Sequence, residues 1–250
     1  MAEALLDVRG LTKSFGGLIA TNRVDVEIAV GETHAIIGPN GAGKTTLIAQ
    51  LAGDLRPDGG TITFAGRDIT ALGAPARSHL GLSRSFQITS VFREFTALDN
   101  VALAVQAHAG HSFRFWRDAR REPELRHRAA AVLDSVGLGA RAGVLAANLA
   151  HGEQRQLEIA MVLATRPRLL LLDEPMAGMG LDESHRMISF LRGLKGHQTI
   201  LLVEHDMDAV FALADRISVM VYGRLIATGS PESIRANPEV REAYLGEEAR

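Results

Sequence analysis

The loop at residues 38–45 reads Gly38-Pro39-Asn40-Gly41-Ala42-Gly43-Lys44-Thr45. An apolar run, Thr33–Ile37, precedes it and a stretch of helical character, from about Lys44 to Ala52, follows it, so we expect a strand, a loop and a helix. In the pattern G-x-x-x-x-G-K-[ST], glycines let the backbone turn tightly and direct N–H groups at phosphate oxygens. The helix adds the positive end of its dipole. The sequence therefore predicts a phosphate-binding loop rather than an ordinary glycine-rich turn.

Two acids later in the chain complete this chemistry. Residues 169–175 read Leu-Leu-Leu-Leu-Asp-Glu-Pro, the pattern of a buried strand that ends in Asp173 and Glu174. Taken alone, such a run is more often a strand that enters a capped loop. Beside a phosphate loop, Asp173 would face a Mg²⁺ site through a water, and Glu174 could accept a proton from the attacking water. Together the two motifs predict a nucleoside triphosphatase.

Composition limits the classes of protein that remain. The chain has 250 residues with 46% hydrophobic and 22% charged residues, which is ordinary for a globular protein. A net charge of −2 provides no general attraction to nucleic acid or acidic lipid. The absence of cysteine excludes disulfides and thiolate metal sites. The first residues do not resemble a signal peptide, and the apolar runs are shorter than the roughly 20 residues of a membrane-spanning helix, so we expect a soluble chain.

The order of sequence patterns predicts one α/β domain with a helical insertion. Short apolar runs occur before residue 88 and again after residue 165, as expected for strands of a largely parallel sheet. The segment from about 88 to 165 is rich in Ala, Leu, Arg and Glu with helical spacing. We therefore expect a nucleotide-binding core at 1–87 and 166–250, with an N-terminal β subdomain, and an inserted α-helical subdomain between its two parts.

Further residues give the chain a resemblance to ABC transporter ATPases that covers nearly its whole length. Residues 149–156, Leu-Ala-His-Gly-Glu-Gln-Arg-Gln, resemble the ABC signature segment, usually LSGGQ followed by a helix. Gln87 is similar to the Q-loop glutamine, His205 to the switch histidine and Phe15 to the aromatic residue that stacks on adenine. Each feature is weak alone, but all occur in the order typical of the family. The resemblance implies the P-loop ATPase fold of ABC type.

Within the ABC family, the chain resembles one branch in particular. Residues 15–18, 87–96, 204–207 and 243–247 are similar to the LivG branch, which serves importers of branched-chain amino acids and their relatives for urea, amides and aromatic acids. The chain also resembles the lipopolysaccharide-export ATPase, but more distantly. An importer ATPase is the leading expectation. An exporter ATPase, an ABC protein acting on nucleic acid or ribosomes, and a module that binds ATP without turnover are the alternatives.

In the resembled family two ATPase domains meet head to tail, and each ATP lies between the phosphate loop of one and the signature segment of the other. The resemblance therefore implies ATP and Mg²⁺ as cofactors. It assigns nucleotide contacts to Phe15, Gly38, Pro39, Asn40, Gly41, Ala42, Gly43, Lys44, Thr45 and Thr46 on one side and to Leu149, Ala150, His151, Gly152 and Glu153 on the other. It assigns catalysis to Glu174 as general base, His205, Lys44 and Gln87, and Mg²⁺ ligation to Thr45, Gln87 and Asp173.

The implied partners are membrane permease subunits, a second ATPase subunit that is identical or LivF-like, and a separate solute-binding protein. The chain would act as a peripheral protein at the cytoplasmic face of the inner membrane, and no direct nucleic-acid partner is expected. A basic stretch with aromatics, residues 113–128, has three possible roles. A solvated helical edge is the first, contact with permease or lipid the second, and nucleic-acid binding the third.

Three positions depart from the pattern of the family. Ala150 stands where the signature usually has serine, which removes a hydroxyl donor to the partner's γ-phosphate, although the Gly152 N–H and the helix N-terminus remain. Glu153 replaces the usual glutamine and places a carboxylate near the expected interface. Gly180 stands where the D-loop usually has aspartate. The first two departures concern the signature segment, and the third concerns communication between subunits.

Overall fold

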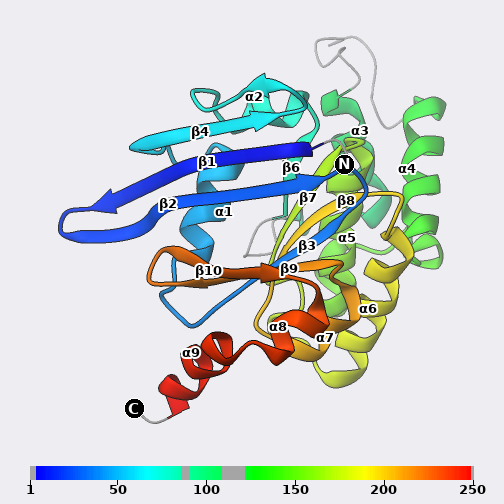
Figure 1. Ribbon diagram of the computed structural model, residues 1–250. Helices are drawn as coiled ribbons and strands as arrows, with labels where there is room; N and C mark the ends of the chain where they lie inside the picture. The colour runs from blue at the N-terminus through cyan, green and yellow to red at the C-terminus, as the bar shows by residue number, and fades with distance from the viewer. Residues whose placement is uncertain (1–3, 86–90, 109–121, 249–250) are drawn as a thin grey trace.

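The computed structural model describes residues 4–85, 91–108 and 122–248, and its strands form two sheets (Figure 1). The first sheet is four-stranded and antiparallel, in the order β2-β1-β4-β5. Its strands are β1 (Ala4–Phe15), β2 (Leu18–Ala29), β4 (Gly59–Phe64) and β5 (Arg67–Asp68). The first two strands form one long hairpin, and Phe15 lies at its tip. This sheet corresponds to the expected N-terminal β subdomain, with two strands before the phosphate loop in the sequence and two after it.

The second sheet is six-stranded, in the order β10-β9-β3-β8-β7-β6, and only the β9–β10 pair is antiparallel. Its strands are β3 (Thr33–Ile37), β6 (Leu82–Arg84), β7 (Leu169–Asp173), β8 (Thr199–Val203), β9 (Arg216–Val221) and β10 (Arg224–Gly229). Every residue of β3, β7 and β8 is buried, as expected for parallel strands covered on both faces. The carboxyl ends of these three adjacent strands meet at one edge of the sheet.

Helices cover the second sheet, and three of them, which lie between β6 and β7 in the sequence, form a separate layer. The helices are α1 (Lys44–Ala52), α2 (Ala74–His79), α3 (Ala97–His108), α4 (Pro123–Ser135), α5 (His151–Ala164), α6 (Leu181–Leu194), α7 (Met207–Leu213), α8 (Pro231–Ala236) and α9 (Pro238–Glu248). Two short 3₁₀ turns, Gly139–Arg141 and Ala146–Asn148, precede α5. Helices α3, α4 and α5 pack around a hydrophobic cluster of their own that includes Val101, Leu133 and Leu157. In Figure 1, α4 lies on the side away from the tip of the β1–β2 hairpin.

Polar residues at the start of β3 are buried and paired. His34 Nδ1 lies 2.9 Å from Glu32 Oε1, and His34 Nε2 lies 2.8 Å from Ser218 Oγ on β9. The Ala29 N–H donates to Glu32 Oε2 at 2.7 Å. Burial raises the pKa of the Glu32 carboxyl, but hydrogen bonds from His34 and Ala29 and the charges of His34 and Arg216 outweigh it and lower the pKa. These contacts fix the start of β3 against β2 and β9.

A buried arginine holds the other end of the strand–loop–helix unit. Arg77 on α2 is 1% exposed, and its guanidinium donates to the carbonyl oxygens of Gln50 and Leu51, both at 2.7 Å, in the last turn of α1. It also donates to the carbonyl oxygens of Leu72 at 2.8 Å and Thr70 at 3.1 Å. Carbonyl groups in the last turn of a helix lack the i+4 donor that earlier carbonyl groups have, so Arg77 adds donors there, beside the Gly53 N–H that reaches the Gln50 carbonyl oxygen at 3.3 Å.

We predict that Arg77→Met lowers the free energy of unfolding by about 2–4 kcal/mol, because it leaves buried carbonyl groups without a donor. Urea denaturation followed by circular dichroism measures the change. Arg67→Met is the control, since Arg67 is exposed on β5, and it should leave the urea midpoint unchanged. Parental stability in the Arg77→Met variant would show that the guanidinium contributes nothing net.

Glu32 gives the stability of the fold a defined dependence on pH. The pKa of its carboxyl is lower in the folded chain than its ordinary value of 4.5, so its stabilising contribution is present above that value and is lost as the pH falls through the folded pKa. We predict that Glu32→Gln unfolds at a lower temperature than the parent at pH 7. The difference should shrink as the pH is lowered from about 5 to about 3. Thermal unfolding at several pH values tests this, and a constant difference would contradict it.

Candidate functional site

At two positions of the phosphate loop, both the backbone conformation and the space around the Cα favour glycine over any other residue. Gly38 has φ 153° and Gly43 has φ 106°. A Cβ at Gly38 would meet the carbonyl oxygen of Met220, and a Cβ at Gly43 would meet the carbonyl oxygen of Ala20. The loop is therefore pressed against the backbones of β9 and β2, which explains why the pattern requires glycine at both positions.

Lys44 and the first turn of α1 form the cationic side of this loop. The Lys44 side chain is almost buried, and its ammonium group donates to the carbonyl oxygens of Gly38 at 2.5 Å and Pro39 at 2.9 Å. Helix α1 begins at Lys44, with Gly43 as its N-cap. The N–H groups of Thr45 and Thr46 have no acceptor within the helix, and Thr45 is exposed. The geometry therefore presents backbone donors, an ammonium group and a hydroxyl at one point, which suits an anion such as a nucleotide phosphate.

The Asp173 carboxylate at the end of β7 is paired on one oxygen only. Asp173 is 1% exposed, and its Oδ2 accepts a hydrogen bond from Arg84 Nη2 at 2.9 Å. Its Oδ1 is buried and has no hydrogen-bond partner among the described residues. Arg84 also contacts Asp54 Oδ2, at 2.8 Å, just past the end of α1. An orphaned carboxylate oxygen beside a phosphate loop fits a Mg²⁺ ion, which proteins bind with one or two carboxylates, phosphates and waters.

Glu174 and His205 lie next to each other where β7 and β8 end. Glu174 Oε1 is 3.9 Å from His205 Nδ1. The side chain of Glu174 is 26% exposed and that of His205 is 64% exposed, so both can reach a water or a ligand. The Glu174 backbone has φ 48°, and its N–H donates to the Val203 carbonyl oxygen at 2.9 Å. The structure thus brings together a carboxylate and an imidazole that are far apart in the sequence.

The segment 149–153 begins α5, and its carboxylate is turned back onto its own helix. Ala150 is the N-cap, and Glu153 Oε2 accepts from the Ala150 N–H at 2.9 Å. Glu153 also accepts two hydrogen bonds from Arg141, at 2.9 and 3.1 Å, which together with the Ala150 N–H lower the pKa of the Glu153 carboxyl despite its desolvation. Leu149 is buried, whereas Ala150 and His151 are exposed. Glu153 is therefore a neutralised capping residue and not a free negative charge.

A second carboxylate contacts the same helix terminus. Glu183, in the first turn of α6, accepts from the Gly152 N–H and from the Gly180 N–H, each at 3.4 Å. Gly180, the residue that replaces aspartate, is the N-cap of α6. A groove of about 860 Å³ opens beside these residues, and its lining includes Arg141, Ala150, Gly152, Glu153 and Glu183. The start of α5 and the start of α6 are thus joined through one side chain.

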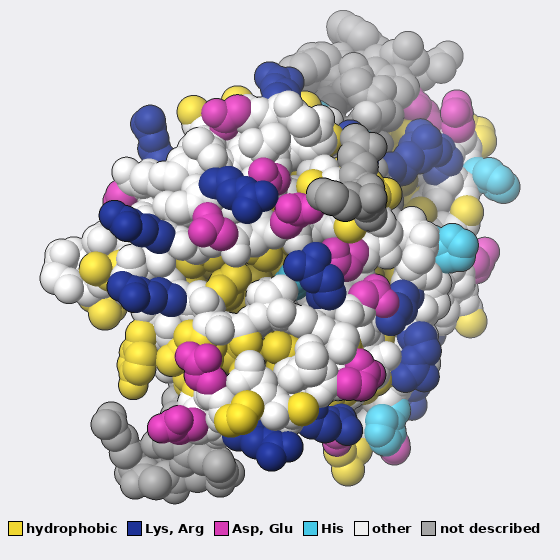
Figure 2. Space-filling view, in the orientation of Figure 1, with side chains coloured by type: hydrophobic (Ala, Val, Ile, Leu, Met, Phe, Trp, Pro, Cys, Tyr) yellow, Lys and Arg dark blue, Asp and Glu magenta, His cyan; other side chains and the backbone are white. Residues whose placement is uncertain are grey.

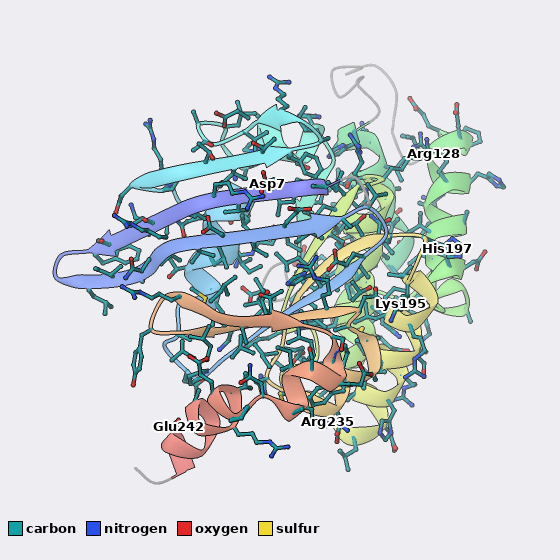
Figure 3. The ribbon with its side chains drawn as sticks, in the orientation of Figure 1. Asp7, Arg128, Lys195, His197, Arg235 and Glu242 are labelled. Atoms are coloured by element: carbon teal, nitrogen blue, oxygen red, sulfur yellow. The ribbon has the colours of Figure 1, made fainter. Side chains whose placement is uncertain are left out.

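Of the two remaining predicted site residues, the structure describes Phe15 but not Gln87. Phe15 ends β1 and is 50% exposed, and the Lys13 ammonium lies 5.7 Å from its ring centroid. The residue is therefore partly open to solvent, where a flat ligand could contact it. Gln87 lies outside the described residues, as does most of the basic aromatic stretch. Of that stretch, Arg126 pairs with Asp99 at 3.0 Å, and Arg128 lies on α4, away from the β1–β2 hairpin (Figure 3).

Comparisons with known proteins agree with this geometry. The ABC transporter family model matches residues 21–177, and a model described as branched-chain amino acid ATP-binding cassette transporter matches residues 224–250. The LivG proteins of Salmonella typhimurium and Escherichia coli, named as high-affinity branched-chain amino acid transport ATP-binding proteins, are each 42% identical over 99% of this chain and 100% of their own length. BraF of Pseudomonas aeruginosa, with the same description, is 41% identical over 99% of this chain and 100% of its own length.

The chain belongs to the LivG/BraF family of ABC transporter ATP-binding proteins. The crystal structure of the ADP conformation of the ABC transporter cassette MJ1267 superimposes with a TM-score of 0.86 at 29% identity, covering 98% of this chain and 100% of that one. A nucleotide-free ATP-binding cassette gives a TM-score of 0.85 at 30% identity, with 97% and 99% covered. The expected ABC fold is confirmed, and the chain is an ABC-type ATPase that binds ATP.

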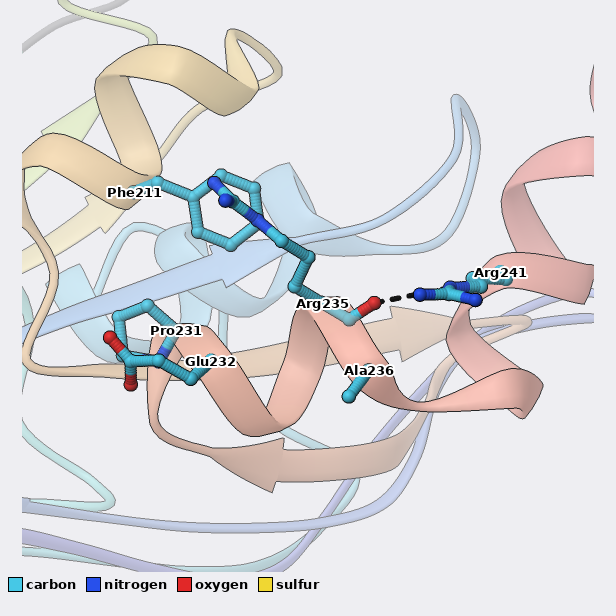
Figure 4. A pocket seen from close by; sticks show the side chains of 6 residues that line it. All are labelled: Phe211, Pro231, Glu232, Arg235, Ala236 and Arg241. Atoms are coloured by element: carbon cyan, nitrogen blue, oxygen red, sulfur yellow. Dashed lines mark hydrogen bonds between the residues drawn. The ribbon is translucent and has the colours of Figure 1, made fainter.

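The part of the LivG/BraF-type chain matched by the C-terminal family model contributes to a second cavity. This cavity has a volume of about 310 Å³ and is lined by Phe211, Pro231, Glu232, Arg235, Ala236 and Arg241 (Figure 4). The Arg235 guanidinium lies 4.2 Å from the Phe211 ring centroid, and Arg241 Nε donates to the Arg235 carbonyl oxygen at 3.1 Å. None of the nucleotide-contact residues expected for an ABC ATPase lines this cavity.

No helix in the described parts of the chain is long and apolar enough to span a bilayer. Basic and acidic side chains are interspersed over the face shown in Figure 2. This face therefore carries no continuous field of one sign.

Three residues of this ABC site were not identified from the sequence. Arg84 pairs with Asp173, which lies 89 positions away, and no local pattern marks such a contact. Glu183 lies three positions after Gly180, and its acidic position in the first turn of a helix was the one available signal. Glu204 directly precedes His205 but is buried, with a carboxylate that accepts from three backbone N–H groups.

We predict that Gly43→Ala abolishes ATP binding, because the new methyl group would displace the loop from the Ala20 carbonyl oxygen. Titration with a fluorescent ATP analogue measures the dissociation constant. Gly66→Ala is the control, since Gly66 also has a positive φ, of 77°, but no atom within 4 Å of its Cβ position. Gly66→Ala should keep parental affinity, and parental affinity in Gly43→Ala would contradict the packing argument.

Proposed function

We propose that the chain is the ATP-hydrolysing subunit of an importer for branched-chain amino acids. The observation that carries the proposal is the end-to-end similarity to LivG and BraF, whose names state this role, together with the C-terminal family match. The transported solute is selected by other subunits, so the site itself supports ATP hydrolysis and the relatives support the solute class. The lipopolysaccharide export protein LptB of Acidithiobacillus ferridurans, at 35% identity, makes an exporter the second candidate.

The proposed catalytic cycle uses each residue where the fold has placed it. Lys44 releases its contacts with the Gly38 and Pro39 carbonyl oxygens and donates to the β and γ phosphates, while the loop N–H groups bind the remaining phosphate oxygens. Glu174 accepts a proton from the attacking water, and His205 donates to the γ-phosphate. Phe15 stacks on the adenine ring.

Mg²⁺ is proposed as the metal, held by Thr45, Gln87 and Asp173, and it would supply charge neutralisation of the β and γ phosphates. The buried, unpaired Oδ1 of Asp173 supports this assignment, because a water bound to the metal could donate to it. Arg84 keeps the other oxygen of this carboxylate occupied, so Asp173 offers one defined acceptor to the metal site.

The proposed complete site requires two copies of an ATPase domain. The residues Leu149, Ala150, His151, Gly152 and Glu153 of one subunit would contact the γ-phosphate on the phosphate loop of the other. Ala150 and His151, which are exposed at the start of α5, and the groove beside them support this arrangement. The second subunit is identical or LivF-like, and the assembly includes permease subunits and a separate solute-binding protein at the cytoplasmic face of the membrane.

We also propose that the chain is a single ABC ATPase domain that consists of a core and a helical insertion. The core would comprise residues 1–87 and 166–250, and the helical insertion would comprise about 88–165. The separate hydrophobic cluster of α3, α4 and α5 supports this division. The signature segment at the start of α5 then belongs to the insertion, while the phosphate loop belongs to the core.

We predict that the purified parent hydrolyses MgATP and that Glu174→Gln lowers the rate by at least about 100-fold, since the amide cannot accept the proton of the attacking water. Phosphate release at saturating ATP measures this. Glu232→Gln, at the exposed start of α8, is the control and should keep the parental rate. Unchanged phosphate release in Glu174→Gln would overturn the proposed mechanism.

The Glu174→Gln protein also tests the two-subunit site. With hydrolysis blocked, MgATP should convert it from monomer to dimer, as measured by light scattering. A dimer would show that one chain supplies both halves of the site and that neither Ala150 nor Gly180 prevents closure. A monomer that still binds ATP would indicate a LivF-like partner or a requirement for the permease.

A further inference from the structure

Glu204 is a buried carboxylate bonded to two loops that come from different strands. It follows β8, and its side chain is 0% exposed. Its Oε1 accepts from the Met176 N–H at 3.0 Å, in the loop after β7. Its Oε2 accepts from the His205 N–H at 3.0 Å and the Asp206 N–H at 3.4 Å, in the loop after β8. One side chain therefore connects the backbone that follows Glu174 with the backbone of His205.

The connection bears directly on the conformation of Glu174. With φ 48°, Glu174 is in the left-handed region, which costs free energy for a residue with a side chain and persists only where neighbouring contacts enforce it. Its own N–H is bound to the Val203 carbonyl oxygen. Two positions later, the Met176 N–H is bound to Glu204. The end of β8 thus holds the backbone at Glu174 and again just beyond it.

The charge of Glu204 is not explained by an ion pair with a strong cation. Among the described residues, the ring of His205 lies with Nδ1 3.7 Å from Oε2, and no lysine or arginine pairs with Glu204. Burial raises the pKa of the Glu204 carboxyl, although hydrogen bonds from the three backbone N–H groups oppose that rise. Burying a carboxylate costs free energy, and an apolar side chain would fill the same space at less cost. We therefore attribute the role of Glu204 to the hydrogen bonds that it accepts.

We propose that Glu204 is a positioning residue for ATP hydrolysis, which holds the Glu174 carboxylate and the His205 ring at a fixed separation through the backbone of their two loops. The inference rests on the proposed role of Glu174 as general base. Glu204 touches neither the nucleotide nor the attacking water, so it acts only through the residues that it orients. Its removal should therefore slow the chemical step without weakening the binding of ATP.

The test is Glu204→Gln, which keeps the shape of the side chain but turns one acceptor oxygen into an NH₂ group that faces a backbone N–H. We expect kcat to fall by about 100-fold, as a misplacement of about 1 Å can cause, while the KM for ATP and the dissociation constant of a fluorescent ATP analogue stay within about twofold of the parent. The melting temperature should remain within a few degrees of the parent.

The matched control is Glu32→Gln, which changes another buried carboxylate that accepts a backbone N–H, at the opposite end of the sheet. It should lower the melting temperature and leave kcat at the parental value. If Glu204→Gln does not fold, Glu204→Asp is measured in its place, because its shorter side chain keeps the charge but cannot reach both loops.

The outcomes separate the inference from the proposed function. A fall in kcat of at least about tenfold with unchanged ATP affinity and melting temperature supports positioning by Glu204. A smaller fall in kcat, or a fall matched by lower ATP affinity or melting temperature, overturns it. Failure of the proposed function appears elsewhere, as an inactive parent or as an active Glu174→Gln protein.

Discussion

The phosphate loop depends on the absence of side-chain atoms at two points of its backbone. Gly38 and Gly43 bring the loop against carbonyl groups of β9 and β2, and this packing fixes the backbone from which α1 begins at Lys44. Both flanks of the loop are then fixed by buried polar contacts. His34 and Glu32 hold the strand that enters it, and Arg77 holds the helix that leaves it.

The proposed chemistry is concentrated where three parallel strands end. β3 leads to the phosphate loop, β7 to Asp173 and Glu174, and β8 to Glu204 and His205. Neighbouring parallel strands place their carboxyl ends together, which is why segments distant in sequence meet there. The side chains then divide into two kinds. Those that face outward can contact a nucleotide, and those that face inward, such as Glu204, bind other loops.

The sequence was informative where chemistry follows from a local pattern. The glycine loop between an apolar strand and a helix, and the leucine run ending in two acids, predicted β3, α1 and β7 correctly. It was uninformative where the partner is distant or the element is short. Arg84 meets Asp173 across two strands, and β5 has two residues, too few for periodicity to appear. Nor does any local pattern show that Arg141 and the Ala150 N–H neutralise Glu153.

Arg77 has a mechanical consequence for this architecture. Its guanidinium binds the last carbonyl groups of α1 from within α2, so a movement of one helix relative to the other would break these hydrogen bonds. The chain then passes from α2 into β6 within three residues and ends that strand at Arg84, whose side chain contacts Asp173. Hydrogen bonds therefore link the last turn of α1 to α2, and the chain links α2 through β6 to the Asp173 carboxylate. A change at the phosphate loop and a change at the Asp173 carboxylate thus share one continuous run of chain, from α1 to β6.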